Sequence, residues 1–540
     1  MNTLPAGTGP SFELTPGKSY PAGSAERAAL EAALDEVQGT DWDVPVRVGG
    51  REIRTGQVFR LEIPHDHGVD LGVTHQAGSA EVEAAIAVAA STSRDWGCAS
   101  AAERVAPFAQ AADMLQQGPW RERLVAATMI ELSKTVGQAD GDVAEAVDFL
   151  RANIANLELL ESVQPSSLPG VTNHVEYRPL EGFVLAVSPF NFTSMNNLAF
   201  APALLGNGVL WKPAESSTLV AHLSLQLLRE AGLPDGVISL LPGDGAVIGG
   251  AALAHSDLAA VHFTGSTATL RHIWHTVGSN VEGYRDYPRI VGEAGGKDFI
   301  LAHPSADVDA LAVACVRGAF DYQGQKCAAA SRFYVPRSLW PALRERLVEM
   351  TAGLVVGDPT RPGIHLGAVI NQRQYAKHSA GLARAREQGV VIAGGTCDDS
   401  VGWFVQPTVL EVSDPRSEFM IDELFAPVMA VYVYDDHAWD DVVELVDGST
   451  EYGLTGAVFA EDETAIAQAD QVLRYAAGNY YINDRPTGAA VGHQPFGGAR
   501  GSGTNDKAGT VWNLIRFTSP RSVKHRHRLD RDTHFPALDE

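Results

Sequence analysis

The stretch "GFVLAVSPFNFTSMNNLAFAPALLGNGVLW", residues 182–211, contains no charged side chain. Its length is that of a membrane-spanning helix. However, Pro189, Pro202 and Gly206 and four asparagines would interrupt an apolar helix. The stretch instead predicts a buried strand, a turn, a helix, a second turn and a second strand. We therefore expect it to form part of the core of a soluble domain.

Short apolar segments alternate with helical ones around this stretch. Strands are expected at 182–187, 208–212, 237–241 and 259–265, and a helix at 217–232. This alternation is typical of βαβ units with a parallel sheet covered on both faces. A second alternating series starts near residue 296, and its strands are expected at 332–336 and 426–434. The first third of the chain is mostly helical by periodicity, with helices at 24–37, 79–91, 102–115 and 141–160.

Length and composition narrow the class of protein. The 540 residues predict two or three domains, and the net charge of −25 argues against a nucleic-acid or anionic-membrane partner. Four cysteines without a CxxC pair do not form a disulfide framework, and the first twenty residues show no targeting pattern. We expect an intracellular, cytoplasmic protein. The histidines of 64–75 and 524–528 lack metal-site spacing, so no metal is expected.

Three glycine-rich or charged segments follow expected strands of the first series. "GDGAVIGG" (243–250) has GxGxxxG rather than GxGxxG spacing, "FTGS" (263–266) offers amides and a hydroxyl to a phosphate, and "WKPAE" (211–215) ends in a carboxylate. Taken alone, each segment is explained as readily by a structural role as by cofactor binding. Together, at the ends of neighbouring strands, they favour a dinucleotide site.

Three residues have side chains suited to acyl chemistry. Cys327 follows Lys326, whose positive charge would lower the pKa of the thiol; the alternative is a cysteine that only fills the core. Glu293 lies in the glycine-rich "GEAGGKD", where burial would raise its pKa toward that of a general base; the alternative is a turn carboxylate bonded to amides. Asn191 can stabilise an oxyanion or simply satisfy the backbone.

The motifs together resemble those of the aldehyde dehydrogenase superfamily. "SPFNF", "LWKPAE", "FTGS", "GEAGGKD", "GQKC", "DELFAPV" and "QPFGGARGSGTN" occur in its order and spacing. Residues 478–509 are similar to the signature of one branch, the Δ1-pyrroline-5-carboxylate dehydrogenases. The resemblance covers residues 20–524. It implies an α/β fold with a Rossmann-like NAD-binding domain, a second α/β catalytic domain and a small β oligomerisation arm.

The resemblance also implies a chemistry. The Cys327 thiolate would attack the aldehyde of L-glutamate-γ-semialdehyde, Asn191 would hold the oxyanion, and Glu293 would activate the water that hydrolyses the thioester. NAD is implied as cofactor, with Glu215 disfavouring NADP. The implied cofactor contacts are Lys212, Glu215, Gly245, Phe263, Gly265, Ser266, Glu423 and Phe425. The implied substrate contacts are Glu145, Phe192, Gly488, Ala489 and Phe496.

Two positions depart from the branch. Ala328 replaces a serine whose hydroxyl helps to bind the substrate carboxylate, and Ala426 replaces a glycine near the cofactor. The first change leaves room for an aldehyde dehydrogenase that acts on another semialdehyde. Two further functional classes stay open: a thiol hydrolase without a cofactor, and a non-catalytic protein of the same fold.

The resemblance finally implies a domain plan and partners. Residues 1–160 and 180–294 form the NAD-binding domain, 295–503 the catalytic domain, 161–179 and 504–524 the oligomerisation arm, and 525–540 a tail. We expect a homodimer or higher homo-oligomer. A chain of this length has no room for a proline-oxidising barrel, so a separate proline dehydrogenase would supply the substrate.

Overall fold

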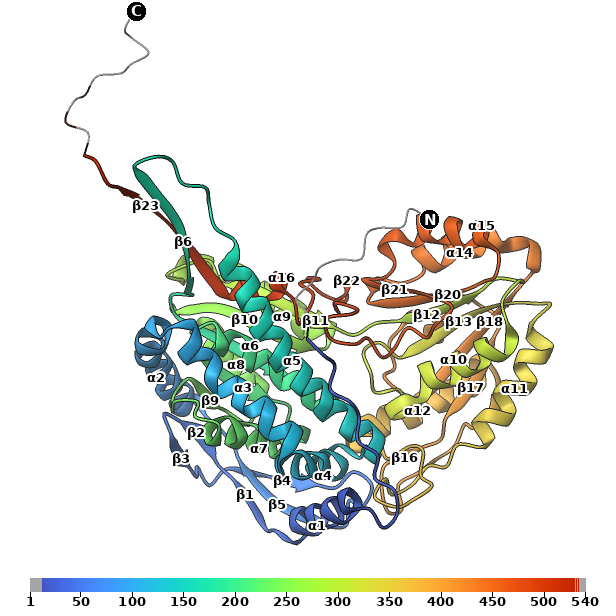
Figure 1. The fold of residues 1–540 in the computed structure, drawn as a ribbon. Helices are drawn as coiled ribbons and strands as arrows, with labels where there is room; N and C mark the ends of the chain where they lie inside the picture. Colours follow the sequence, from blue (N-terminus) through green and yellow to red (C-terminus); the bar gives the residue numbers. More distant parts are fainter. Residues whose placement is uncertain (1–11, 530, 532, 534–540) are drawn as a thin grey trace, which may run out of the picture.

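Two seven-stranded sheets, each covered by helices on both faces, organise the chain (Figure 1). The computed structural model describes residues 12–529, 531 and 533. The predicted α/β fold with two such domains is therefore confirmed. Part of the expected tail, 525–540, lies outside the described residues.

The first sheet has the order β11-β10-β7-β8-β9-β2-β3. Its parallel strands are β11 (Arg289–Ala294), β10 (Leu258–Gly265), β7 (Phe183–Ser188), β8 (Gly208–Pro213) and β9 (Ile238–Leu240). Antiparallel β2 (Val46–Val48) and β3 (Arg51–Ile53) extend one edge. The uncharged stretch forms β7, η1 (Thr193–Asn196), α6 (Asn197–Leu204) and β8, as the sequence predicts.

Helices cover this sheet because successive residues of each strand face opposite sides. Phe183 and Leu185 pack with α2 (Ser79–Cys98), α8 (Gly245–Ala254) and α9 (Thr267–Ser279). Val184 and Ala186 pack on the other face, in a core shared by α3 (Ala101–Gln117), α4 (Trp120–Leu132), α5 (Val136–Ser162), α6 and α7 (Thr218–Glu230). Apolar side chains therefore pack against both faces of the central strands.

The second sheet has the order β14-β17-β18-β13-β12-β20-β21. Its strands are β14 (Gly389–Ala393), β17 (Thr408–Val412), β18 (Val428–Tyr434), β13 (Ala330–Pro336), β12 (Asp298–Ala302), β20 (Thr455–Phe459) and β21 (Asn479–Ile482). Only β14 pairs antiparallel among them. One face packs against α10 (Val308–Phe320) and α11 (Trp340–Ala352), the other against α12 (Gln372–Gln388), α14 (Trp439–Gly448) and α15 (Glu463–Val472).

The four helices expected in the first third of the chain are confirmed, but residues 42–75 form strands that the periodicity does not predict. After α1 (Ala25–Gly39), a three-stranded sheet is formed by β1 (Trp42–Val44), β4 (Val58–Glu62) and β5 (Asp70–His75). Before α1, residues 12–20 run along α5, where the Thr15 amide donates to Asp148 and the Lys18 amide to Asp140 (Figure 1).

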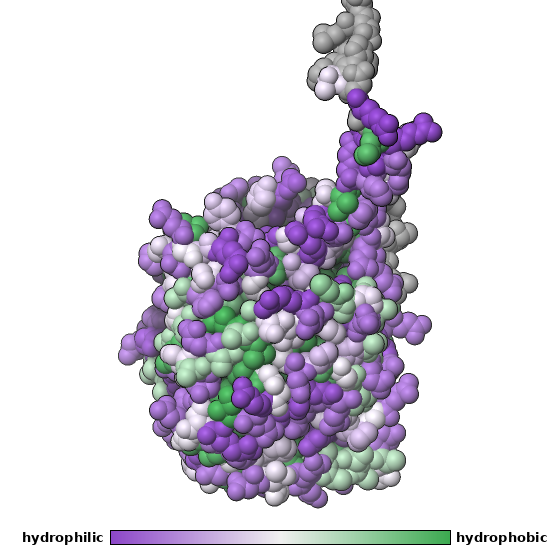
Figure 2. Space-filling model, turned by 90° about the vertical axis from the view of Figure 1, so that its left-hand side faces the viewer, coloured by the Kyte–Doolittle hydropathy of each residue, from purple (hydrophilic) through white to green (hydrophobic). Residues whose placement is uncertain are grey.

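A two-stranded ribbon projects from the body. β6 (Val171–Pro179) pairs antiparallel with β23 (Thr518–Arg526) over its whole length. Figure 2 shows it standing clear of the molecule with a mainly hydrophilic surface. The arm predicted to resume at 504 becomes a strand only at Thr518. Of the preceding residues, α16 (Val511–Leu514) packs against α5 and η7 (Ile515–Phe517) against β11 of the first sheet.

Within the described part of the chain, no helix has the length and apolar character needed to cross a membrane. The same residues contain no group of three or more side chains suited to hold a metal ion.

Candidate active site

A cavity of about 680 Å³ lies where the two sheets meet. It brings together Cys327, Glu293 and all five predicted substrate residues. Its walls are formed by Glu145, Phe149, Phe192, Met195, Glu293, Lys326, Cys327, Ala328, Thr487, Gly488, Ala489, Ala490, Val491, Gln494, Phe496 and Ala508. Asn191, which is 4% exposed, directly precedes Phe192 in the turn after β7. Segments from distant parts of the sequence therefore form one chamber.

A rigid turn presents Cys327 to this chamber. The turn contains left-handed residues at Tyr322, Gln323 and Gly324, with φ of +50°, +55° and +68°. Gly324 is required, because a Cβ there would lie 2.3 Å from the Ala426 carbonyl oxygen. The Tyr322 hydroxyl donates to the Leu132 carbonyl at 2.9 Å. The turn is thus held by contacts to both halves of the molecule, and Cys327 is 9% exposed.

The expected lowering of the Cys327 pKa is wrong for the protein in this structure. Burial raises the pKa of the thiol well above its ordinary value, and the carboxylates of Glu293, Asp298 and Glu423 raise it further. Lys326 does not offset this, because its ammonium forms an ion pair with Asp321. A neighbour in sequence is therefore not the dominant electrostatic neighbour. The thiol is the resting form.

Glu293, at the end of β11, faces the same chamber. Burial raises its pKa to about 7, while the positive charge of Lys507 lowers it and the carboxylate of Glu145 raises it. Its Oε1 is buried and accepts no hydrogen bond from the described residues. A carboxylate with a vacant acceptor and a pKa near neutrality is suited to take a proton from water.

A cluster of paired charges forms the wall around Phe192. The Lys134 ammonium lies 4.5 Å from the centre of the Phe192 ring and forms an ion pair with Asp142. Glu145 of α5 accepts a hydrogen bond of 2.6 Å from the Ser194 hydroxyl, and burial raises its pKa to about 7. Glu145 is thus not the solvated helix residue that its type alone would suggest.

The loop after β21 forms the opposite wall. Gly488 has φ +84°, a conformation that favours glycine, and the Ala490 amide donates to Gln494 Oε1 at 3.0 Å. Ala328 and Ala489 face the cavity with methyl groups. The buried Thr487 hydroxyl makes no hydrogen bond to the described residues. Donors to a carboxylate on this wall are therefore backbone amides and the Thr487 hydroxyl.

The predicted adenosine contacts lie at the carboxyl edge of the first sheet. Lys212 ends β8, and a Cβ on Gly245, at the start of α8, would lie 3.9 Å from its Nζ. Burial lowers the pKa of Lys212, whereas Glu215 and Asp244 raise it. Phe263 and Gly265 belong to β10, and the Ser266 hydroxyl accepts from the Thr269 amide as the N-cap of α9. These residues fit a dinucleotide on the α8 and α9 N-termini.

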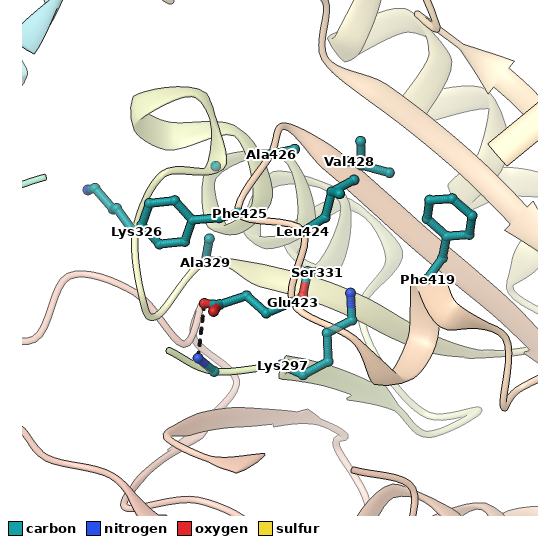
Figure 3. Close-up of a pocket in the computed structure, with 12 residues that line it drawn as sticks. Lys297, Lys326, Ala329, Ser331, Phe419, Glu423, Leu424, Phe425, Ala426 and Val428 are labelled. Atoms are coloured by element: carbon teal, nitrogen blue, oxygen red, sulfur yellow. Dashed lines mark hydrogen bonds between the residues drawn. The ribbon is translucent and has the colours of Figure 1, made fainter. Parts of the chain in front are cut away.

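Glu423 and Phe425 come from the second half of the molecule, in the loop before β18. Figure 3 shows the Glu423 carboxylate directed at the turn that precedes Lys297, where Oε1 accepts from the Gly296 amide at 3.1 Å. A Cβ on Gly295 would lie 1.9 Å from Glu423 Oε2, so glycine is needed beneath this carboxylate. Burial raises the Glu423 pKa to about 7.

Sequence reasoning missed several residues at the site. Phe149, Val491, Gln494 and Thr487 line the cavity without having been predicted to do so. Lys507, which acts on Glu293, was also missed. Helix α5 carries both Glu145 and Phe149, so a helix spacing of four from Glu145 would have found Phe149. No local signal marks the others.

Comparison with known proteins gives the same assignment along most of the chain. Residues 54–523 match the aldehyde dehydrogenase family. The mitochondrial delta-1-pyrroline-5-carboxylate dehydrogenase of Bos taurus is 44% identical over 525 residues, covering 96% of this chain and 93% of that protein.

Solved structures agree with the sequence match. The delta-pyrroline-5-carboxylate dehydrogenase of Mycobacterium tuberculosis bound with NAD superposes with a TM-score of 0.93 at 46% identity, covering 99% of this chain and 100% of that one. Proline utilization A of Bdellovibrio bacteriovorus matches with a TM-score of 0.90 at 28% identity, over 97% of this chain and 54% of that one. This chain therefore belongs to the aldehyde dehydrogenase family, in the branch of the delta-1-pyrroline-5-carboxylate dehydrogenases.

Proposed function

We propose that this protein oxidises L-glutamate-γ-semialdehyde, the hydrolysed form of Δ1-pyrroline-5-carboxylate, to L-glutamate with NAD⁺, the second step of proline degradation. The observation that carries the proposal is the single cavity that joins a cysteine, a general base and a loop of backbone amides. The names of the bovine and Mycobacterium tuberculosis relatives, at 44% and 46% identity, support the same substrate.

The reaction uses the groups in an order that their chemistry sets. Cys327 Sγ bonds to the aldehyde carbon, and the Asn191 amide and the Cys327 backbone N–H stabilise the oxyanion. A bound NAD⁺ would supply the hydride acceptor that turns the thiohemiacetal into a thioester. Glu293 then takes a proton from water as the water oxygen attacks the thioester carbon and the Cys327 thiolate leaves. Because the pKa of Cys327 is raised, its thiol proton must pass to solvent as the sulfur attacks, and Glu293 stays a carboxylate for the later proton transfer from water.

The cofactor assignment depends on the sheet edge and on the loop before β18. Lys212 and Glu215 bind the adenosine ribose, and Glu215 disfavours a 2′-phosphate because like charges repel. Gly245, Phe263, Gly265 and Ser266 surround the pyrophosphate at the α8 and α9 N-termini. Glu423 and Phe425 bind the nicotinamide ribose. Gly295 leaves room for the Glu423 carboxylate in this position.

The substrate is held at its two ends. The amides of Gly488 and Ala489 bind the α-carboxylate, and Glu145 faces the α-amino group. Phe192 and Phe496 enclose the aliphatic stem. Because Ala328 lacks a hydroxyl, an aldehyde dehydrogenase reaction on another semialdehyde is the second candidate.

We further propose a domain plan and partners. Residues 1–160 and 180–294 bind NAD, 295–503 carry the catalytic cysteine, and the β6–β23 ribbon joins subunits of a homodimer or larger homo-oligomer. The ribbon supports this, because among the described residues neither β6 nor β23 has a second neighbouring strand. A cytoplasmic location suits the four free cysteines. A separate proline dehydrogenase supplies the substrate.

The test is NADH formation by the purified protein. We expect kcat/KM for glutamate-γ-semialdehyde to exceed that for an aldehyde of equal length without the α-carboxylate by about a hundredfold, the effect of one or two hydrogen bonds to a charged group. Equal values would favour the second candidate. NADH from neither aldehyde would overturn both, and turnover of esters without NAD⁺ would indicate a thiol hydrolase.

A further inference from the structure

Residues 503–509 are hydrogen-bonded to β11, the strand that carries Glu293. Gly503 forms an isolated antiparallel bridge with Glu293. The Gly292 amide donates to the Thr504 hydroxyl at 2.9 Å, and the Thr504 amide donates to the Gly292 carbonyl at 2.8 Å. The position of residues 503–509 relative to the general base is therefore set by hydrogen bonds on both sides of Gly292.

The backbone of this segment has an unusual conformation at two residues, one of them Lys507. Asn505 and Lys507 have φ of +57° and +55°, a conformation that side-chain-bearing residues rarely adopt. Such strain persists only where surrounding contacts impose it, and it is concentrated at functional sites.

The Lys507 ammonium is fixed by three acceptors. It donates to the carbonyl oxygens of Gly478 at 2.8 Å and Gly497 at 3.0 Å, and to Asn479 Oδ1 at 3.4 Å. All three are uncharged, so they hold the ammonium in place without neutralising it. Burial lowers the pKa of Lys507, and the carboxylate of Glu293 opposes this by favouring the charged ammonium. The lysine thus supplies a fixed positive charge, not one half of a surface ion pair.

Lys507 and Glu293 line a second cavity, of about 450 Å³. This cavity also has Asn505 and Phe496 in its wall, and it shares Glu293 with the substrate chamber. Because Glu293 Oε1 accepts no hydrogen bond from the described residues, the two groups interact across space and not by contact. An interaction between partly buried charges is screened less than one between charges in bulk water.

We propose that Lys507 is a positioning residue for thioester hydrolysis: its fixed charge acts across the second cavity to keep Glu293 in the carboxylate form that accepts the proton of the attacking water. Lys507 keeps its own proton throughout. The water proton goes to Glu293, the water oxygen bonds to the acyl carbon, and the carbon–sulfur bond to Cys327 breaks. This inference rests on the proposed function.

The other charges around Glu293 favour the same role. Burial and the Glu145 carboxylate both raise the pKa of Glu293, and Lys507 is the group that opposes them. Cys327 faces Glu293 as a neutral thiol at rest. Without Lys507, burial and one negative neighbour would act on the base unopposed. Its active form would then be reached only at higher pH.

The test uses Lys507→Gln, which keeps hydrogen-bond donors but removes the charge, with Lys507→Arg as the charge-retaining control. In each variant a rapid-mixing experiment with semialdehyde and NAD⁺ separates the NADH burst from the later turnover, across a pH series from mildly acidic to mildly basic. We expect the acid limb of the turnover profile to move up by about one pH unit in Lys507→Gln, the size of shift caused by one nearby opposite charge. The arginine variant should keep the wild-type limb.

A second comparison distinguishes electrostatics from packing. In a Glu293→Gln background, Lys507→Gln should cause no further loss of hydrolysis, because its target is gone. An unmoved limb in Lys507→Gln, or an equal loss in the Glu293→Gln background, would overturn the inference. Failure of the proposed function shows itself differently, as the absence of any NADH burst in the wild-type protein.

Discussion

Two glutamates, a buried one near the end of α4 and a partly buried one near the end of β11, differ in what their carboxylates contact. Burial raises the pKa of both Glu131 and Glu293 to about 7. Glu131, however, accepts from the Leu219 amide at 2.9 Å and the Val220 amide at 2.8 Å, satisfying the N-terminus of α7. Glu293 Oε1 accepts from no described residue and faces a cavity. The unpaired acceptor on a cavity wall, more than the raised pKa, supports the proposal that Glu293 is the base.

The largest effect on activity should come from replacing Glu293. Glu293→Gln is expected to lower the steady-state kcat for semialdehyde oxidation by about 10²–10⁴, the usual contribution of a general base. The first NADH turnover should survive better than the later ones, because the amide cannot take the proton of water. Stopped-flow absorbance measures both phases. Turnover within about tenfold of wild type would remove Glu293 from the base role.

The satisfied glutamate should show the opposite behaviour. Glu131→Leu leaves two buried amides without an acceptor, so we expect the free energy of unfolding to fall by about 2–4 kcal/mol while kcat of the folded enzyme stays near wild type. Urea denaturation and steady-state assays measure the two quantities. Glu158→Leu, on an exposed position of α5, is the control and should change stability by about 0.5 kcal/mol or less. A Glu131→Leu variant that folds but is inactive would contradict the assignment of a purely structural role to Glu131.

The substrate's α-carboxylate is a third buried carboxylate, and Ala328 offers it no hydroxyl where the branch pattern has a serine. Ala328→Ser should lower KM for glutamate-γ-semialdehyde by about tenfold, because one hydrogen bond to a charged group is gained. The same change should leave KM for an aldehyde without the carboxylate unaltered. Equal changes for both aldehydes would mean that the serine alters the pocket shape and not the donor set.

The last prediction concerns the pH dependence of stability. The folded pKa of Glu293 is about 7, against 4.5 for the free side chain. As pH rises from 4.5 to about 7, the unfolded chain therefore loses a proton that the folded chain keeps, and the free energy of unfolding falls. Glu293→Gln lacks this loss. Its melting temperature should match wild type below the lower of these two pKa values and exceed it above the higher one; a constant difference across this range would contradict the raised pKa.

The sequence predicts best what depends on short-range pattern. The parallel strands from β7 to β10 follow from alternating apolar runs bounded by glycine and proline, and the uncharged stretch reads correctly as strand, helix and strand. Cys327, Glu293 and the loop at Gly488 were predicted, through resemblance, and the structure places them in one cavity. The strands of 42–75 were missed, because each is short and lacks a clear period of two.

Electrostatic properties could not be predicted from neighbours in the sequence. Lys326 adjoins Cys327, yet it forms an ion pair with Asp321. The pKa of the thiol is instead raised by the carboxylates of Glu293, Asp298 and Glu423, in addition to burial. Lys507 acts on Glu293, a base far earlier in the chain. Such effects depend on which distant segments the fold places in one cavity. That information is not contained in any local window.

The most direct test of the account is to trap the acyl enzyme. Glu293→Gln mixed with glutamate-γ-semialdehyde and NAD⁺ should release about one NADH per subunit and then stall, and intact mass measurement followed by peptide mapping should find a glutamyl thioester on Cys327. Glu131→Leu under the same conditions should turn over and accumulate no adduct. No burst and no adduct in Glu293→Gln, or the same adduct in both variants, would contradict the claim that the carboxylate with the vacant acceptor is the hydrolytic base.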